Sequence, residues 1–233
     1  QEIKKPVDIK KAKSMKEAGV YITPIIPLNI ELDYLNEGFE GGVIPPTGWT
    51  TVINNAGFTW KINNVTPYSG LYNADVEYDP AVVPQDELLI SPSIDLSSVI
   101  GSLVIRFYWN TSYYWFVSPN NNGDVLLKIS SDGGTTWTSL WSEDSVGVFT
   151  NWTWYEQVLD LSAYVGQSNV KIAFNYIGVD AAQFSLDEIS LYSIAGPGAP
   201  TNPNPADGVF GVPITASEAT WDNPAGATSN EFW

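Results

Sequence analysis

Residues 124–141 have the sequence DVLLKISSDGGTTWTSLW, two β-forming runs on either side of a polar turn. Val125, Leu127 and Ile129 occupy every second position of the first run, which is the period of a strand with one buried face. Between the runs, Asp132 precedes two glycines, and an aspartate side chain caps the kind of turn that glycine permits. The stretch therefore predicts a β-hairpin.

The same succession of short strands and turns extends over residues 36–194. Runs such as GWTTVI, SLVIRFYW and NVKIAFNYI are separated by glycine, asparagine and aspartate, the residues of tight turns. Val170, Ile172 and Phe174 repeat the strand period, and roughly ten short strands are typical of a sandwich or jelly roll. The predicted fold class is therefore all-β, a two-sheet jelly-roll sandwich.

Four segments are expected along the chain: an N-terminal arm and extended strand (1–35), the jelly roll (36–194), a linker (195–208) and a final segment (209–233). The arm begins lysine-rich and continues into a β-forming stretch, where Pro24 and Pro27 allow only an edge or extended position. The linker is rich in proline, glycine and asparagine. The final segment is long enough for about three strands, whereas a complete Ig-like sandwich needs roughly seven.

The residue types that are absent exclude several kinds of site. The chain has no cysteine and no histidine, so disulfides, zinc–thiolate sites, Ser-His-Asp and Cys-His centres and histidine-based metal sites are excluded. We therefore predict that the protein is not an enzyme. No run of about eighteen apolar residues is present, so membrane insertion is not predicted.

The formal net charge of −16 is unevenly distributed along the chain. Residues 1–16 carry six of the ten basic side chains and a net charge of +4, which leaves −20 for the remainder. Such an acidic body repels nucleic acid and anionic lipid, and it favours a hard cation such as calcium or a basic protein partner. A surface charge that only maintains solubility is an equal alternative.

Five motifs, taken in order, resemble one family. They are NEGFEGGVIPPTGW (36–49), QDELLISPSIDLS (85–97), DVLLKISSDGGTTWTSLW (124–141), WYEQVLDLSAYVGQSNVKIAFNYIG (154–178) and FSLDEISLY (184–192). Together they resemble the cleaved-adhesin or choice-of-anchor jelly-roll domains of bacterial surface and secreted proteins, which are MAM-like in shape. The final segment, with Trp221 as its expected core tryptophan, resembles the start of a fibronectin type III-like domain. The resemblance implies a non-catalytic protein that is extracellular or on the cell surface.

The resemblance also implies a structural calcium ion as cofactor. The positions that match the family's acidic residues are Glu40, Asp187 and, more weakly, Asp86. Calcium takes about six to eight oxygen ligands, and a first strand lying beside the last would bring Glu40 and Asp187 together. In the alternative, both carboxylates face water at turns or edges. The sequence NNNGD (120–124) also has oxygen ligands at loop spacing, but a plain hairpin turn is the preferred interpretation.

An aromatic cluster at residues 108–116 is a candidate ligand-binding surface. Its candidate residues are Trp109, Tyr114 and Trp115, because aromatic rings on a concave sheet face stack on sugar rings. At the period of a strand, however, half of the cluster must face the core.

The pattern S-x-D-x-G-x-x-W at residues 130–137 is the Asp box known from sialidase propellers. A propeller repeats the box in each blade, and here it occurs once. We therefore predict a structural turn, with Trp137 largely buried and no ligand at Asp132.

The preferred hypothesis is an adhesion or structural module of a bacterial surface protein, and the alternative is a carbohydrate-binding module of a larger secreted enzyme. The predicted partners are other copies of the chain, cell-surface proteins or glycans. A homopolymer such as a filament or surface layer would form by strand exchange. In that arrangement the extended stretch Val20–Leu35 adds to an open sheet edge of a neighbouring copy.

Overall fold

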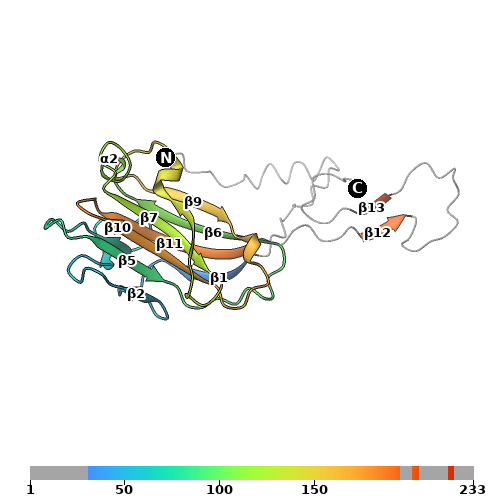
Figure 1. Ribbon diagram of the computed structural model, residues 1–233. Helices are drawn as coiled ribbons and strands as arrows, with labels where there is room; N and C mark the ends of the chain where they lie inside the picture. The colour runs from blue at the N-terminus through green and yellow to red at the C-terminus, as the bar shows by residue number, and fades with distance from the viewer. Residues whose placement is uncertain (1–30, 195–200, 205–219, 223–233) are drawn as a thin grey trace. The chain divides into compact units, whose positions relative to one another are not determined.

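The computed structural model describes residues 31–194, 201–204 and 220–222, and residues 31–194 form a sandwich of two antiparallel sheets (Figure 1). The six-stranded sheet has the order β3-β4-β11-β6-β9, with β1 also paired to β11. The five-stranded sheet has the order β2-β5-β10-β7-β8. The predicted all-β, two-sheet sandwich is thereby confirmed.

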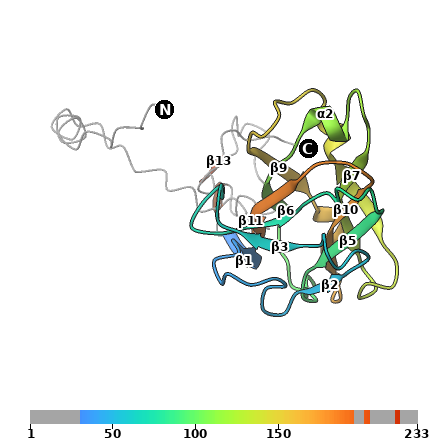
Figure 2. The ribbon, with the colours of Figure 1, turned by 90° about the vertical axis from the view of Figure 1, so that its left-hand side faces the viewer.

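Both sheets draw their strands from the whole length of residues 31–194. The six-stranded sheet contains β1 (Glu31–Glu37), β3 (Lys61–Asn63), β4 (Asn73–Val76), β6 (Ser102–Asn110), β9 (Tyr155–Asp160) and β11 (Phe184–Ile194). The five-stranded sheet contains β2 (Thr50–Val52), β5 (Gln85–Ile90), β7 (Gly123–Ser130), β8 (Thr138–Ser142) and β10 (Lys171–Gly178). The loops contain the short helical turns α2 (Tyr113–Phe116), η1 (Glu143–Val146) and η2 (Ser162–Tyr164). Figure 2 shows the layers from the side, with β3 and β11 in one and β5 and β10 in the other.

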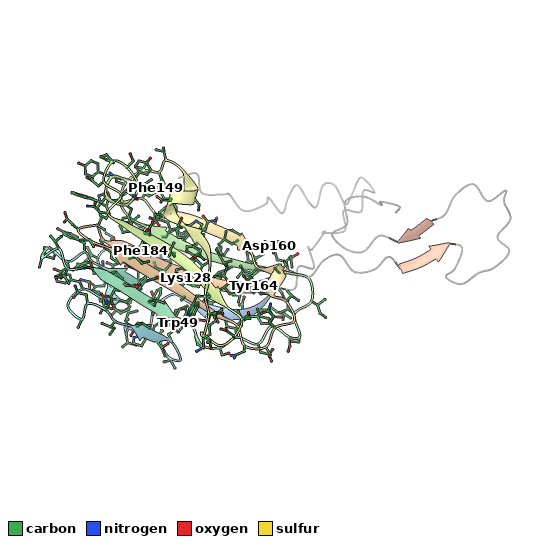
Figure 3. The ribbon with its side chains drawn as sticks, in the orientation of Figure 1. Trp49, Lys128, Phe149, Asp160, Tyr164 and Phe184 are labelled. Atoms are coloured by element: carbon green, nitrogen blue, oxygen red, sulfur yellow. The ribbon has the colours of Figure 1, made fainter. Side chains whose placement is uncertain are left out.

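Aromatic side chains from both sheets fill the space between them. Phe107 of β6 meets Phe174 of β10 and Trp141 of β8 edge-on, with ring centroids 5.0 and 5.3 Å apart. Trp109 packs in the same way on Trp141 and on Phe149, which is labelled in Figure 3. Each such pair contributes about 0.5–1.5 kcal/mol beyond the apolar area that it buries. The alternation of apolar residues in β6 and β10 therefore determines which face of each sheet is inside.

The stretch at residues 124–141 forms the hairpin of β7 and β8. At its turn, the Asp132 carboxylate accepts hydrogen bonds from the N–H groups of Thr135 (3.0 Å) and Thr136 (2.9 Å). Trp137 differs from its prediction, because it is only half-buried. Its indole lies over Gly134 of the turn rather than between the sheets.

The first strand, β1, begins inside the stretch that the sequence analysis assigned to the arm. Residues 31–35 pair with β11 of the same chain, for example Leu32 with Ser193 and Leu35 with Leu191. This part of the predicted donor stretch is thus an edge strand of its own sandwich. The rest of the arm lies outside the described residues.

Two further short strands, β12 (Thr201–Asn204) and β13 (Thr220–Asp222), pair with each other in antiparallel orientation. The other residues of the predicted linker and final segment lie outside the described residues, so the fibronectin type III-like assignment stays a prediction. In the described part of the chain, no helix has the length and apolar character needed to cross a membrane.

Candidate functional site

Gln183, which directly precedes β11, lines four adjoining hollows of about 240 to 540 Å³ each. Their walls include Asn110 and Ser185, whose chain neighbours Trp109 and Phe184 face the core. Because side chains alternate along a strand, the hollow that these two residues line opens on the outer face of the six-stranded sheet, and the others adjoin it at Gln183. Since they share Gln183, we treat them as one depression and call it the outer groove.

The floor of the outer groove is a hydrogen-bonded network around the buried carboxylate of Asp75. This carboxylate accepts hydrogen bonds from the amides of Asn63, Asn73 (2.5 Å) and Gln183 (2.8 Å). Burial raises the pKa of Asp75, and the hydrogen bonds from Asn63, Ser185 and Asn73 partly offset the rise. Gln183 Nε2 also donates to Ser185 Oγ at 3.1 Å. The Gln183 amide is therefore held in one orientation, and its Oε1, which has no partner among the described residues, can accept a hydrogen bond from a ligand.

Four aromatic side chains line the same groove. Tyr78 and Trp152 are 40% and 55% exposed, whereas Trp115 and Trp154 are half-buried. Trp115 comes from α2, Tyr78 follows β4, and the other two belong to the loop before β9. The indole N–H of Trp154 donates to the carbonyl of Thr66 at 3.2 Å, which fixes the ring.

The loop between β3 and β4, residues 64–72, folds over the outer face of its own sheet and forms one wall of the groove. Tyr68 stacks on Tyr108 of β6, with ring centroids 3.7 Å apart and planes 12° apart, and Trp154 meets Tyr68 edge-on. The Tyr108 hydroxyl donates to Glu156 of β9 at 2.8 Å. A wall held in this way is largely formed before a ligand arrives, which lowers the entropy cost of binding.

Only one of the three aromatic residues predicted to bind a ligand, Trp115, lines the outer groove. Tyr114 is exposed and contacts Trp115 edge-on from outside the lining. Trp109 must be corrected, because the odd-numbered residues of β6 face the core and its side chain is 0% exposed. Gln183 and Trp152 of the outer groove were not predicted from the sequence. For Trp152, the sequence signal available was the pair of tryptophans on either side of Thr153, just before β9.

Glu40 and Asp187, the predicted calcium ligands, both bind the 64–72 loop. Asp187 lies at a bulge of β11, and its Oδ2 accepts hydrogen bonds from the N–H groups of Tyr68 (3.0 Å) and Ser69 (3.2 Å). Glu40 accepts from the N–H of Leu71 at 2.9 Å. Burial raises the pKa of Asp187 to about 6. Backbone N–H groups thus reach both oxygens of each carboxylate, and calcium at this position stays a prediction.

Asp86, the third predicted calcium ligand, lies elsewhere. It is an exposed residue of β5, in the five-stranded sheet, and it accepts a hydrogen bond from Asn175 Nδ2 at 2.8 Å. Packed sheets are about 10 Å apart, and Asp86 faces solvent on the far side. It therefore cannot share an ion with Asp187, which belongs to the other sheet.

A different acidic cluster lies where β7 begins and β8 ends. One carboxylate oxygen from each of Asp124, Glu143 and Asp144 lies within 4.8 Å of the other two. Glu143 is fully buried; its Oε2 accepts a hydrogen bond from the N–H of Val125 at 2.7 Å, and its buried Oε1 has no partner. Burial above all, and then the charges of the two aspartates, raises the pKa of Glu143 to about 8. In the described part of the chain, no other three acidic side chains converge in this way.

Comparison with known proteins establishes the fold. No protein-family model and no curated protein matches the sequence. The K3 cleaved adhesin domain of Lys-gingipain from Porphyromonas gingivalis is similar, with a TM-score of 0.53 and 20% identity over 70% of this chain and 99% of that one. For the K2 cleaved adhesin domain of Lys-gingipain, the TM-score is 0.51 and the identity 19%, over 70% of this chain and 99% of that one.

A xylan-binding CBM22-1 domain from Paenibacillus barcinonensis Xyn10C gives a TM-score of 0.46 and 15% identity, over 72% of this chain and 98% of that one. Because the two adhesin domains are only 20% and 19% identical to this chain, their similarity shows a shared β-sandwich fold alone. The part of the expected resemblance that concerns the cleaved-adhesin fold is therefore confirmed.

Proposed function

We propose that this chain is a non-catalytic, extracellular binding module that attaches to glycans through the outer groove. The observation that carries the proposal is the position of Gln183, an amide held by Asp75 and Ser185 among aromatic rings. Aromatic faces stack on the apolar faces of sugar rings, and fixed amide groups accept hydrogen bonds from sugar hydroxyls.

The charge and the size of the groove favour a neutral polysaccharide. Lys61 and Glu77, which line part of it, form an ion pair at 2.7 Å and so neutralise each other. Several adjoining hollows rather than a single closed pocket suit a ligand of several sugar units.

The same network supports binding rather than hydrolysis. A glycosidase needs two accessible carboxyl groups about 5 to 10 Å apart on either side of the scissile bond. Asp75 is 0% exposed and engaged by three side-chain amides, and Glu77 is paired with Lys61. These two carboxyl groups therefore hold the shape of the groove, and Asp180, which also lines it, is a single carboxylate rather than a pair.

Adhesion is the role that we assign to this binding, and the two similar solved domains are themselves named adhesin domains. Self-assembly by strand exchange is a separate part of the proposal. Exchange would repeat, between two copies, the pairing of β1 with β11 that exists within one chain.

Affinity electrophoresis against neutral xylans, glucans and mannans, followed by calorimetry, tests the groove. Trp152→Ala and Gln183→Ala should each weaken binding about tenfold or more, because each removes one recognition group, and tenfold corresponds to about 1.4 kcal/mol. Trp152→Phe keeps a ring face and should retain part of the affinity.

The matched control is Gln167→Ala. Gln167 is a half-buried glutamine in the loop after η2, where its backbone bonds Leu96 and Tyr164 and its side chain makes no hydrogen bond to the described residues. This variant should bind as the unchanged protein does. Failure to bind any member of the panel, or equal binding by Trp152→Ala and Gln183→Ala, would refute the proposal.

A further inference from the structure

The cluster of Asp124, Glu143 and Asp144 contains a polar atom that the protein does not satisfy. Glu143 has no exposed surface, and its Oε1 accepts no hydrogen bond from the described residues. Leaving a buried carboxylate oxygen without a partner costs free energy, and two nearby carboxylates increase that cost. This oxygen can therefore take a partner from outside the described residues.

Among the described residues, no basic side chain forms an ion pair with this cluster. Among the described residues the ion pair found is Lys61–Glu77, on the six-stranded sheet, whereas the cluster lies at β7 and β8 of the other sheet. The chain as a whole has ten basic residues against 26 acidic ones. Three converging carboxylates without a lysine or arginine are an arrangement that a metal cation stabilises.

We propose that Asp124, Glu143 and Asp144 bind a divalent cation, and that calcium is the ion. All three donors are carboxylate oxygens, and the chain has no histidine or cysteine to bind zinc. Calcium accepts irregular sets of about six to eight oxygens, including water. Asp144 is exposed, so water can complete the coordination from the open side.

An ion at this cluster would join the bases of two loops that carry aromatic residues of the outer groove. The loop after α2 leads into Asp124, and the N–H of Asn122 in it donates to the carbonyl of Trp115 at 2.9 Å. The loop that follows η1, which begins at Glu143, continues to Trp152. If the outer groove binds glycans, as proposed above, this arrangement makes the glycan affinity depend on calcium. The proposal of the ion site itself does not depend on glycan binding.

The test is thermal unfolding in EDTA and in calcium from about 0.1 to 10 mM, a range that covers the affinities of extracellular calcium sites. Calcium should raise the Tm of the unchanged protein, because an ion that binds only the native state stabilises it. Asp144→Asn should lower the calcium affinity about tenfold or more, as measured by calorimetry, because ligand charge sets the affinity of such sites. Asp144 is suited to this because it is exposed and accepts no hydrogen bond from the described residues.

The matched control is Asp33→Asn, which removes the same charge from an exposed residue of β1 and should leave calcium binding unchanged. Glu143→Gln keeps an acceptor for Val125 and should also lose the calcium response. No Tm change with calcium, or an undiminished response in both Asp144→Asn and Glu143→Gln, would overturn the inference. A response lost in Glu40→Gln but kept in Asp144→Asn would do the same, since the ion would then be at the other site.

Discussion

Asp132 is an exposed carboxylate that organises the turn of the β7–β8 hairpin. It accepts hydrogen bonds from the N–H and hydroxyl of Thr136, from the Ser130 hydroxyl and from the N–H of Thr135. These hydrogen bonds hold the pKa of Asp132 well below its ordinary value, and the bond from the Thr136 N–H has the largest effect. The ionised form is thus the one that the folded turn prefers.

Asp132→Asn should therefore lower the Tm at neutral pH, because an amide accepts fewer hydrogen bonds than a carboxylate. A depressed folded-state pKa gives stability that is present above the unfolded pKa of 3.8 and is lost as the pH falls through the folded value. The Tm difference between variant and parent should accordingly shrink below a pH of about 4. Thermal unfolding across the acid range measures this Tm difference, with Asp33→Asn as control. If Asp132→Asn were as stable as the parent at pH 7, the role of Asp132 in the turn would be contradicted.

At the scale of elements, the 64–72 loop is held by two carboxylates, Glu40 in the turn after β1 and Asp187 in β11. Gly70 has a φ of +62°, and a Cβ there would overlap the Glu40 carboxylate. Gly70→Ala should lower the free energy of unfolding by about 1–3 kcal/mol, because it strains the backbone and pushes the loop off its anchor. Gly41→Ala is the matched control, with no atom within 4 Å of the added Cβ. Chemical denaturation measures both, and equal stability of the two variants would contradict this account.

The calcium ion predicted beside Glu40 and Asp187 is tested at the same loop. If it binds, EDTA should lower the Tm of Asp144→Asn, in which the other cluster is weakened, by removing an ion that stabilises the native state. Glu40→Gln in that background should abolish the effect. An EDTA response that persists without both Glu40 and Asp144 would mean that neither cluster holds the ion.

For the whole molecule, the arm and the body carry opposite charge, +4 in residues 1–16 against −20 in the rest. If copies assemble through the arm, deletion of residues 1–30 should abolish assembly and leave the jelly roll stable, since β1 begins at Glu31 and remains paired with β11. Light scattering and electron microscopy measure assembly, and thermal unfolding measures the stability of the jelly roll. Added salt should weaken the electrostatic part. A monomeric intact chain would refute assembly.

The fold was predictable because its determinants are local. The alternation at Val125, Leu127 and Ile129 and the Asp132 turn define a hairpin from adjacent residues alone. Repeated along the chain, this pattern indicates a two-sheet sandwich, since each strand has one face to bury. The start of β1 was harder to predict, because an edge strand with one neighbour carries a weaker signal.

The outer groove was not predictable because its parts meet only through sheet pairing. Gln183 is 108 residues from Asp75 in the sequence, and antiparallel pairing of β11 with β4 makes them neighbours. The aromatic run at residues 108–116 indicated a binding surface, but strand period alone could not show that Trp109 faces inward and Trp115 outward.

By itself, then, the sequence of this protein determined its class, its strands and its turns, because hydrophobic period and turn chemistry act between near neighbours. It also excluded cysteine and histidine chemistry by composition. Only the tertiary structure decided which carboxylates converge. Glu40 and Asp187 reach one loop, Asp86 lies on the other sheet, and Asp124 meets Glu143. The physical reason is that strand order and loop paths set these distances, and both depend on how the whole core packs.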